Sequence, residues 1–240
     1  SKIIMANNME RITLTPYQTI FYYEWLQDPD RSDYNIVIDN TIVGEIDKKK
    51  YNDSFEQMLN EHLITRHNID DGPEGAFWVP REPVFNLVTY HDTPLTDEEI
   101  YALVSAPFDL RNGPLVRIHL ISLGAERYRT LFIFHHIVVD GISTEEIWDK
   151  WRKRYNGIDY QVPSLQEQGV MHQQLCHNFA TLLQEKGEQM REFWRERLGD
   201  LEGVDLRFLQ TGRQLTTAAT RRQIGELLFG FDEDISRRVK

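Results

Sequence analysis

The chain has 240 residues, of which 40% are hydrophobic and 27% are charged, a composition typical of a globular protein with a buried core. Its net charge of −11 disfavours nucleic acids and anionic membranes as partners, because both are polyanions. The single cysteine excludes an internal disulfide framework, and no apolar run reaches the ~20 residues of a membrane-spanning helix, so we expect a cytoplasmic protein.

The first predicted elements are a helix and a strand. Thr15, Pro16 and Gln18 fit the N-cap, first and third positions of a helix that ends at residues 28–30. The run over residues 34–43 predicts a strand. The apolar face of the helix is predicted to contain Tyr17, Ile20, Phe21 and Trp25.

Further elements follow up to the middle of the chain. Asp47 caps a second predicted helix, and short strands are expected at residues 76–79 and 84–90. Thr96 caps a third helix, which runs through Val104. The apolar stripe of the second helix is predicted to contain Tyr51, Phe55, Met58, Leu59 and Leu63.

The middle of the chain predicts a hairpin followed by a helix. Residues 115–123 and 128–134 read as two strands joined by a turn at residues 124–127. Ser143 is the expected N-cap of the next helix, which stops at residues 156–157. The apolar face of this helix holds Ile147, Trp148, Trp151 and Tyr155, which we expect to be core.

The last third begins with a linker at residues 158–163. Two helices are predicted after it, at residues 164–183 and 188–198, and a final strand at 224–231 precedes a helix that starts at Asp232 and is cut off by the chain end. Alternating strands and helices place the chain in the mixed α/β or α+β class.

The most informative segment is His135-His136-Ile137-Val138-Val139-Asp140-Gly141. It follows the predicted strand directly and precedes the predicted helix, so a strand ends on two imidazoles and a short loop carries a carboxylate. A helix N-terminus offers unpaired N–H groups and the positive end of its dipole. This arrangement is suited to hold a neutral histidine beside a reacting centre.

The pattern HHxxxDG resembles the signature of condensation domains of nonribosomal peptide synthetases. Three further segments are similar to motifs of the same family and occur in the same order. Residues 107–117 match PFDLxxGPLxR at every fixed position, residues 14–18 match LTPxQ, and residues 193–198 resemble an aromatic-Trp-x-x-x-Leu helix. One segment departs from the family, because Arg66-His67 keeps only the start of RHExLRTxF.

The resemblance implies a chloramphenicol-acetyltransferase-like fold with two lobes and an active-site tunnel between them. Residues 1–160 would form the N-terminal lobe with the motif, and residues 161–240 would supply connecting helices and the start of a truncated C-terminal lobe. Without the rest of that lobe we expect the chain itself to be inactive.

The implied reaction is amide formation between a carrier-bound acyl or aminoacyl thioester donor and a carrier-bound aminoacyl acceptor. The partners would be two carrier protein domains and neighbouring synthetase domains such as adenylation domains. The chain would bind no cofactor itself, because its substrates are carried on phosphopantetheine.

Three other functions stay open. An epimerisation domain shares HHxxxDG but commonly continues with Ser-Trp, whereas here Ser143 precedes Thr144. A coenzyme A-dependent or ester-forming acyltransferase of the same superfamily is the second alternative. A non-catalytic docking module is the third, although an intact His136 argues against it.

His136 is the predicted catalytic residue, as general base toward the acceptor amine or as a group that orients it. His135 is expected to pack beside it, and Gly141 to allow a special backbone conformation or a close substrate approach. Asp140 fits the orienting acid of a triad, whereas the resemblance implies a structural ion pair with Arg66. A metal site is not expected, because adjacent histidines on a strand diverge.

Overall fold

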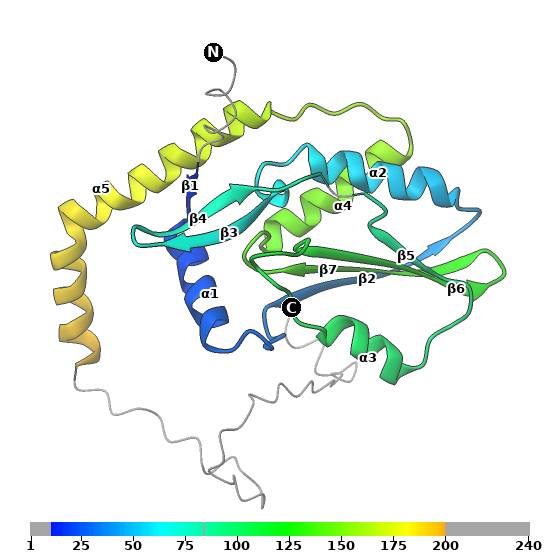
Figure 1. The fold of residues 1–240 in the computed structure, drawn as a ribbon, viewed down its shortest axis with the longest axis horizontal. Coiled ribbons are helices and arrows are strands. Elements are labelled where there is room, and N and C mark those ends of the chain that lie inside the picture. Colours follow the sequence, from blue (N-terminus) through cyan, green and yellow to red (C-terminus); the bar gives the residue numbers. More distant parts are fainter. Residues whose placement is uncertain (1–10, 84, 200–240) are drawn as a thin grey trace, which may run out of the picture. The chain divides into compact units, whose positions relative to one another are not determined.

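The computed structural model describes residues 11–83 and 85–199 (Figure 1). The chain divides into two compact units, Ser1–Met190 and Arg191–Lys240, and every described strand belongs to the first. The predictions for residues 224–231 and for the helix from Asp232 lie outside the described residues. No helix of the described part is long and apolar enough to cross a membrane.

A four-stranded sheet forms the centre of the first unit. Its order is β2 (Asn35–Val43), β7 (Arg127–His135), β6 (Val116–Gly124) and β5 (Val88–His91). β5 runs parallel to β6, and the other neighbours are antiparallel. The predicted hairpin of β6 and β7 is confirmed, and its turn uses the positive φ of Ala125 and Glu126.

A smaller antiparallel sheet lies in the same unit, with the order β1 (Ile12–Thr13), β4 (Gly75–Pro80) and β3 (His67–Gly72). β4 contains the strand predicted at residues 76–79, whereas the sequence pattern does not predict β3. Its sequence His-Asn-Ile-Asp-Asp-Gly lacks the apolar alternation that marks a strand. It is held instead by pairing with β4, which a local pattern does not reveal.

The predicted helix starts are confirmed at three caps. Thr15 caps α1 (Pro16–Gln27), Asp47 caps α2 (Lys48–Asn60) and Thr96 caps α3 (Asp97–Ser105). Two of these three caps are complete capping boxes, in α1 through Gln18 and in α3 through Glu99. A single 3-10 turn, η1 (Ile64–Arg66), follows α2.

The two helices predicted at residues 164–183 and 188–198 are wrong as separate elements. They form one helix, α5 (Leu165–Leu198), which crosses from the first unit into the second. The segment between the two predicted helices holds Gly187 but no proline, and an isolated glycine weakens a helix without breaking it.

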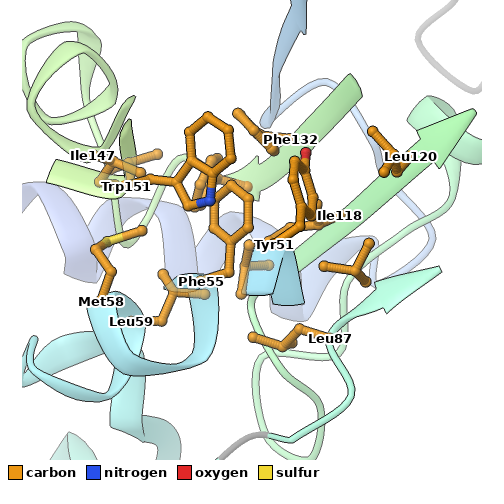
Figure 2. Close-up of a cluster of buried hydrophobic side chains, with 14 residues drawn as sticks. Tyr51, Phe55, Met58, Leu59, Leu87, Ile118, Leu120, Phe132, Ile147 and Trp151 are labelled. Atoms are coloured by element: carbon orange, nitrogen blue, oxygen red, sulfur yellow. The ribbon is translucent and has the colours of Figure 1, made fainter. Parts of the chain in front are cut away.

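One hydrophobic core lies between the four-stranded sheet and two helices, α2 and α4 (Gly141–Tyr155) (Figures 1 and 2). Phe55 of α2 stacks on Trp151 of α4 with 4.8 Å between ring centroids, and both contact Phe132 of β7. The predicted stripe of α2 is therefore core, except that Leu63 lies beyond the helix.

A second core covers the opposite face of the sheet, because alternate residues of β7 point to opposite sides. Its members include Tyr22 and Trp25 of α1. The predicted apolar face of α1 is wrong in part, since Tyr17 is 67% and Ile20 53% exposed. Instead, the face of α1 that carries Tyr22 and Trp25 packs in the second core. The mixed α/β class predicted from the sequence is confirmed.

Candidate active site

The two motif histidines leave the sheet at the end of β7. The backbone N–H of His135 donates to the carbonyl of Leu115 at 3.1 Å, and the backbone N–H of His136 donates to the carbonyl of Tyr34 at 2.8 Å. These bonds lie on opposite sides of β7, because Leu115 directly precedes β6 and Tyr34 directly precedes β2. The backbone of both histidines is therefore fixed although the strand ends here.

His135 is buried inside the protein. It is 1% exposed, and the rings of Phe21, Tyr34 and Phe108 meet its ring edge-on at 6.1 to 6.5 Å between centroids. Its Nδ1 accepts the backbone N–H of Ile137 at 3.0 Å, so this nitrogen carries no proton. Burial, with smaller contributions from His136 and Arg31, lowers the pKa of His135 to about 4. The residue is a neutral packing group.

This lowered pKa predicts an acid-sensitive fold. The unfolded chain takes up a proton at His135 near the ordinary pKa of 6.5, whereas the folded chain resists protonation until about 4. Stability is therefore full above pH 6.5 and falls as pH declines toward 4, by up to about 3 kcal/mol from this group. Burial also lowers the pKa of His119, to about 4, and the pKa values of His62 and His67, so the native protein contains further such groups.

The variant His135→Asn isolates the contribution of His135 to this loss of stability at low pH. The amide oxygen of asparagine can still accept the Ile137 N–H, but the side chain does not titrate. Urea unfolding at about pH 7 and at about pH 4.5 measures the loss of stability on acidification. We expect a smaller loss in the variant than in the wild-type protein, although the variant is less stable at neutral pH. An identical loss in both would contradict the assignment.

His136 lies at the surface of the same cluster. It is half-buried, and its ring stacks on Phe21 of α1 at 5.0 Å with 27° between the planes. Its Nδ1 is buried without a hydrogen-bond partner among the described residues, so Nε2 is the ring nitrogen left accessible. The adjacent histidines thus differ in environment: His135 is enclosed by aromatic rings, and His136 is half-buried, with no hydrogen bond to its Nε2 from the described residues.

Asp140 caps the helix that follows the motif. Its Oδ1 accepts the backbone N–H of Ser143 at 2.8 Å and the Ser143 hydroxyl at 2.7 Å, and α4 begins at the next residue. These hydrogen bonds from Ser143 lower the pKa of Asp140. The prediction of Ser143 as the N-cap is therefore wrong by three residues, since the Asp140 side chain occupies that position and accepts the first-turn N–H.

The predicted ion pair between Asp140 and Arg66 is not formed within the described part of the chain. Asp140 is engaged by Ser143, and the Nε of Arg66 is buried without a hydrogen-bond partner in the structure. The described residues also show no hydrogen bond from a ring N–H of His136 to the Asp140 carboxylate, as a triad would require. The carboxylate acts locally on the N-terminus of α4.

Gly141 does not need its conformational freedom, because its φ lies outside the left-handed region. That part of the prediction is wrong. A Cβ built on Gly141 would meet nothing within 4 Å, so the space beside this first residue of α4 is open. The open space fits the other prediction, a close approach of substrate.

Gln18 is a site residue whose role sequence reasoning missed. Its Nε2 donates to the carbonyl of Ile137 at 3.3 Å, and its Oε1 accepts from Trp78 Nε1 at 3.1 Å. The capping box indicates Gln18 as a helix-start residue, and this is also confirmed. The bond to the motif joins residues 119 positions apart, and no local pattern predicts it.

Residues 8–238 match the family model of the condensation domain. The chain belongs to the condensation-domain family. It is 27% identical to surfactin synthase subunit 2 of Bacillus subtilis (strain 168) over 99% of the chain, and 31% identical to a linear gramicidin synthase protein of Brevibacillus parabrevis over 74%. These matches cover only 6% and 2% of the two relatives.

Solved condensation domains share the fold. The first condensation domain of the calcium-dependent antibiotic synthetase, in complex with a substrate analogue, aligns over 82% of this chain with a TM-score of 0.68 and 16% identity. The starter condensation domain of rhizomide synthetase in complex with C8-CoA aligns over 80% with a TM-score of 0.66 and 19% identity. The chain spans 50% and 46% of these two structures. The predicted chloramphenicol-acetyltransferase-like fold is confirmed.

The PFDL segment of this condensation domain packs against His135. Phe108 is buried against His135, and its carbonyl accepts the indole N–H of Trp25 at 2.9 Å. The guanidinium of Arg117 lies 3.9 Å from the Phe108 ring centroid. Asp109 accepts the backbone N–H of Arg111 and so closes the turn. The motif therefore contributes one of the three aromatic rings that contact the buried His135.

The described residues contain no group of three or more His, Cys, Asp or Glu side chains arranged to hold a metal ion. Nε2 of His136, which forms no hydrogen bond within the described part of the chain, is a group suited to acid–base or hydrogen-bonding chemistry. Such a group needs geometry that holds it within reach of the proton it moves. The fixed backbone of His136 and its stacking on Phe21 supply that geometry.

Proposed function

We propose that this chain is the N-terminal part of a condensation domain that forms an amide bond in a nonribosomal peptide synthetase. The donor is an acyl or aminoacyl thioester, and the acceptor is the amine of an aminoacyl group, each carried on the phosphopantetheine of a carrier protein. The observation that carries the proposal is the placement of His136, with one accessible nitrogen at the end of β7, in a chain of this family.

Amide formation needs the reactants to be held together, the attacking nitrogen to lose a proton and the oxyanion to be stabilised. Nε2 of His136 is the atom placed for the second task, either by taking the proton or by accepting a hydrogen bond that orients the amine. In both roles the imidazole must be neutral when the amine arrives. His135 contributes indirectly, because its Nδ1 accepts the N–H of Ile137, the residue that follows His136.

The remaining parts of the proposal follow from family membership. Residues 1–160 form the N-terminal lobe, and residues 161–240 connect to and begin the second lobe, in keeping with the half coverage of solved domains. The chain binds no cofactor of its own, and its partners are carrier and adenylation domains of the synthetase. A four-domain nonribosomal peptide synthetase bound to AMP and glycine shares the fold of this chain with a TM-score of 0.58. The cytoplasmic location predicted from the sequence belongs to the same proposal.

The proposal is tested with the complete domain and two carrier proteins, each loaded with a different aminoacyl group. Mass spectrometry of the acceptor carrier should show the mass of the dipeptidyl thioester. Transfer only from acyl-coenzyme A, or only to a hydroxyl acceptor, would favour the acyltransferase alternatives. Inversion of a carrier-bound residue without transfer would indicate epimerisation, and carrier binding without covalent change would indicate docking.

A further inference from the structure

The side chain of Gln18 joins three separate elements of the first unit. Its Oε1 accepts the backbone N–H of Thr15 at 2.9 Å, within the capping box of α1, and the indole N–H of Trp78 from β4 at 3.1 Å. Its Nε2 donates to the carbonyl of Ile137 at 3.3 Å, in the motif loop. Trp78 is fully buried, so this link is anchored in the second core.

These three partners allow only one orientation of the amide. Two N–H donors face the oxygen of Gln18, and one carbonyl faces its nitrogen. A reversed amide would set N–H against N–H and oxygen against oxygen. The side chain therefore keeps a fixed direction toward Ile137.

Ile137 directly follows His136, and both of its polar backbone groups are held by side chains. Its N–H donates to Nδ1 of His135, and its C=O accepts from Gln18. Three positions along the same helix, Phe21 stacks on the His136 ring. Residues three apart lie on one face of a helix, so α1 contacts the motif loop at two neighbouring points.

We infer that Gln18 is a positioning residue for His136. By holding the Ile137 carbonyl it fixes the backbone from which the imidazole extends, and with Phe21 it sets the direction of Nε2. The inference rests on the proposed function for its effect on rate. Misplacement of a reacting group by about 1 Å costs on the order of 100-fold in rate, which is the scale at which such a residue acts.

The sharpest test is Gln18→Glu, assayed at about pH 8, where a glutamate is ionised. A carboxylate keeps both acceptor roles, toward Thr15 and Trp78, and completes a capping box as Glu99 does in α3. It cannot donate to the Ile137 carbonyl. In the complete domain we expect kcat to fall roughly 10-fold to 100-fold while KM for the loaded carriers stays near wild type. The melting temperature should also fall, because a carboxylate oxygen then faces the Ile137 carbonyl.

A matched control separates positioning from capping. Glu99→Ala removes the equivalent capping-box residue of α3, whose side chain accepts hydrogen bonds from Thr96, so it lowers helix stability without contacting the motif. Gln18→Ala removes capping and positioning together. We expect kcat to fall in Gln18→Ala and in Gln18→Glu, and to stay at the wild-type value in Glu99→Ala. Wild-type kcat in Gln18→Glu would overturn the inference.

A second readout does not depend on catalysis. In the chain itself, the imidazole carbon and nitrogen resonances of His136 should shift in Gln18→Glu and stay unchanged in Glu99→Ala. If the complete wild-type domain formed no amide while these resonances moved as expected, the proposed function would fail and the positioning role would stand. Unchanged His136 resonances in Gln18→Glu would overturn the positioning role, whatever the activity.

Discussion

His136→Ala in the complete domain is expected to lower the rate of amide formation by roughly 100-fold to 10,000-fold, the usual contribution of a general base. The fold should survive, because His136 is half-buried at the end of β7 and its Nδ1 has no hydrogen-bond partner among the described residues. The rate is measured by mass spectrometry of the acceptor carrier, and the fold by melting temperature.

Two companion variants make the result interpretable. Asp140→Ala removes the cap of α4 and should lower the free energy of unfolding by about 0.5 to 2 kcal/mol. It should affect the rate less than His136→Ala, because Asp140 accepts hydrogen bonds from Ser143 and forms none with the imidazole. His136→Gln retains an acceptor without a base, so a rate near wild type in this variant would assign His136 an orienting role. Near-wild-type product formation by His136→Ala would remove His136 from the chemistry altogether.

The elements that the sequence predicts correctly are those fixed by neighbouring residues. Thr15 and Thr96 can be predicted as helix N-caps, because their side chains accept hydrogen bonds from backbone N–H groups only three positions away. The hairpin of β6 and β7 follows from two apolar runs and a short turn. The motif also places His136 correctly at a strand end, because the strand and the following helix are both local signals.

The wrong predictions concern choices that local chemistry leaves open or that distant residues decide. Asp140 and Ser143 are both good N-caps, and the sequence alone does not tell which of them ends the loop. The polar strand β3 exists because β4 pairs with it. Tyr17 is expected in the core from its spacing, yet the packing of Tyr22 and Trp25 decides which side of α1 is buried.

The candidate site shows the same division. The imidazole and carboxylate of the motif are evident from the sequence, but the expected partner of Asp140 is wrong, because the carboxylate is satisfied three residues away instead of by Arg66. The link from Gln18 to Ile137 spans 119 positions. A capping box explains why Gln18 stands there, and only the fold shows that its second hydrogen-bonding group reaches the motif loop.

The chain alone is expected to show no measurable amide formation, even with correctly loaded carrier proteins. It spans 50% of the solved condensation domain that it matches with a TM-score of 0.68, so half of that fold has no aligned counterpart in this chain. A reaction at Nε2 of His136 would then take place in contact with water, and hydrogen bonds to a developing oxyanion are weak in a high-dielectric site. Two carrier-bound substrates also need residues on both sides to hold them in position, and we expect one lobe alone not to provide them.

The two cores explain why the chain should nevertheless fold. α2 and α4 cover one face of the sheet, and α1 with the smaller sheet packs on the other, all within Ser1–Met190. Circular dichroism and a cooperative melt of the chain are compared with product formation by the complete domain under the same conditions. Amide product from the chain alone, at a rate that His136→Ala abolishes, would show that the catalytic machinery lies within these residues and that the second lobe is dispensable for the reaction.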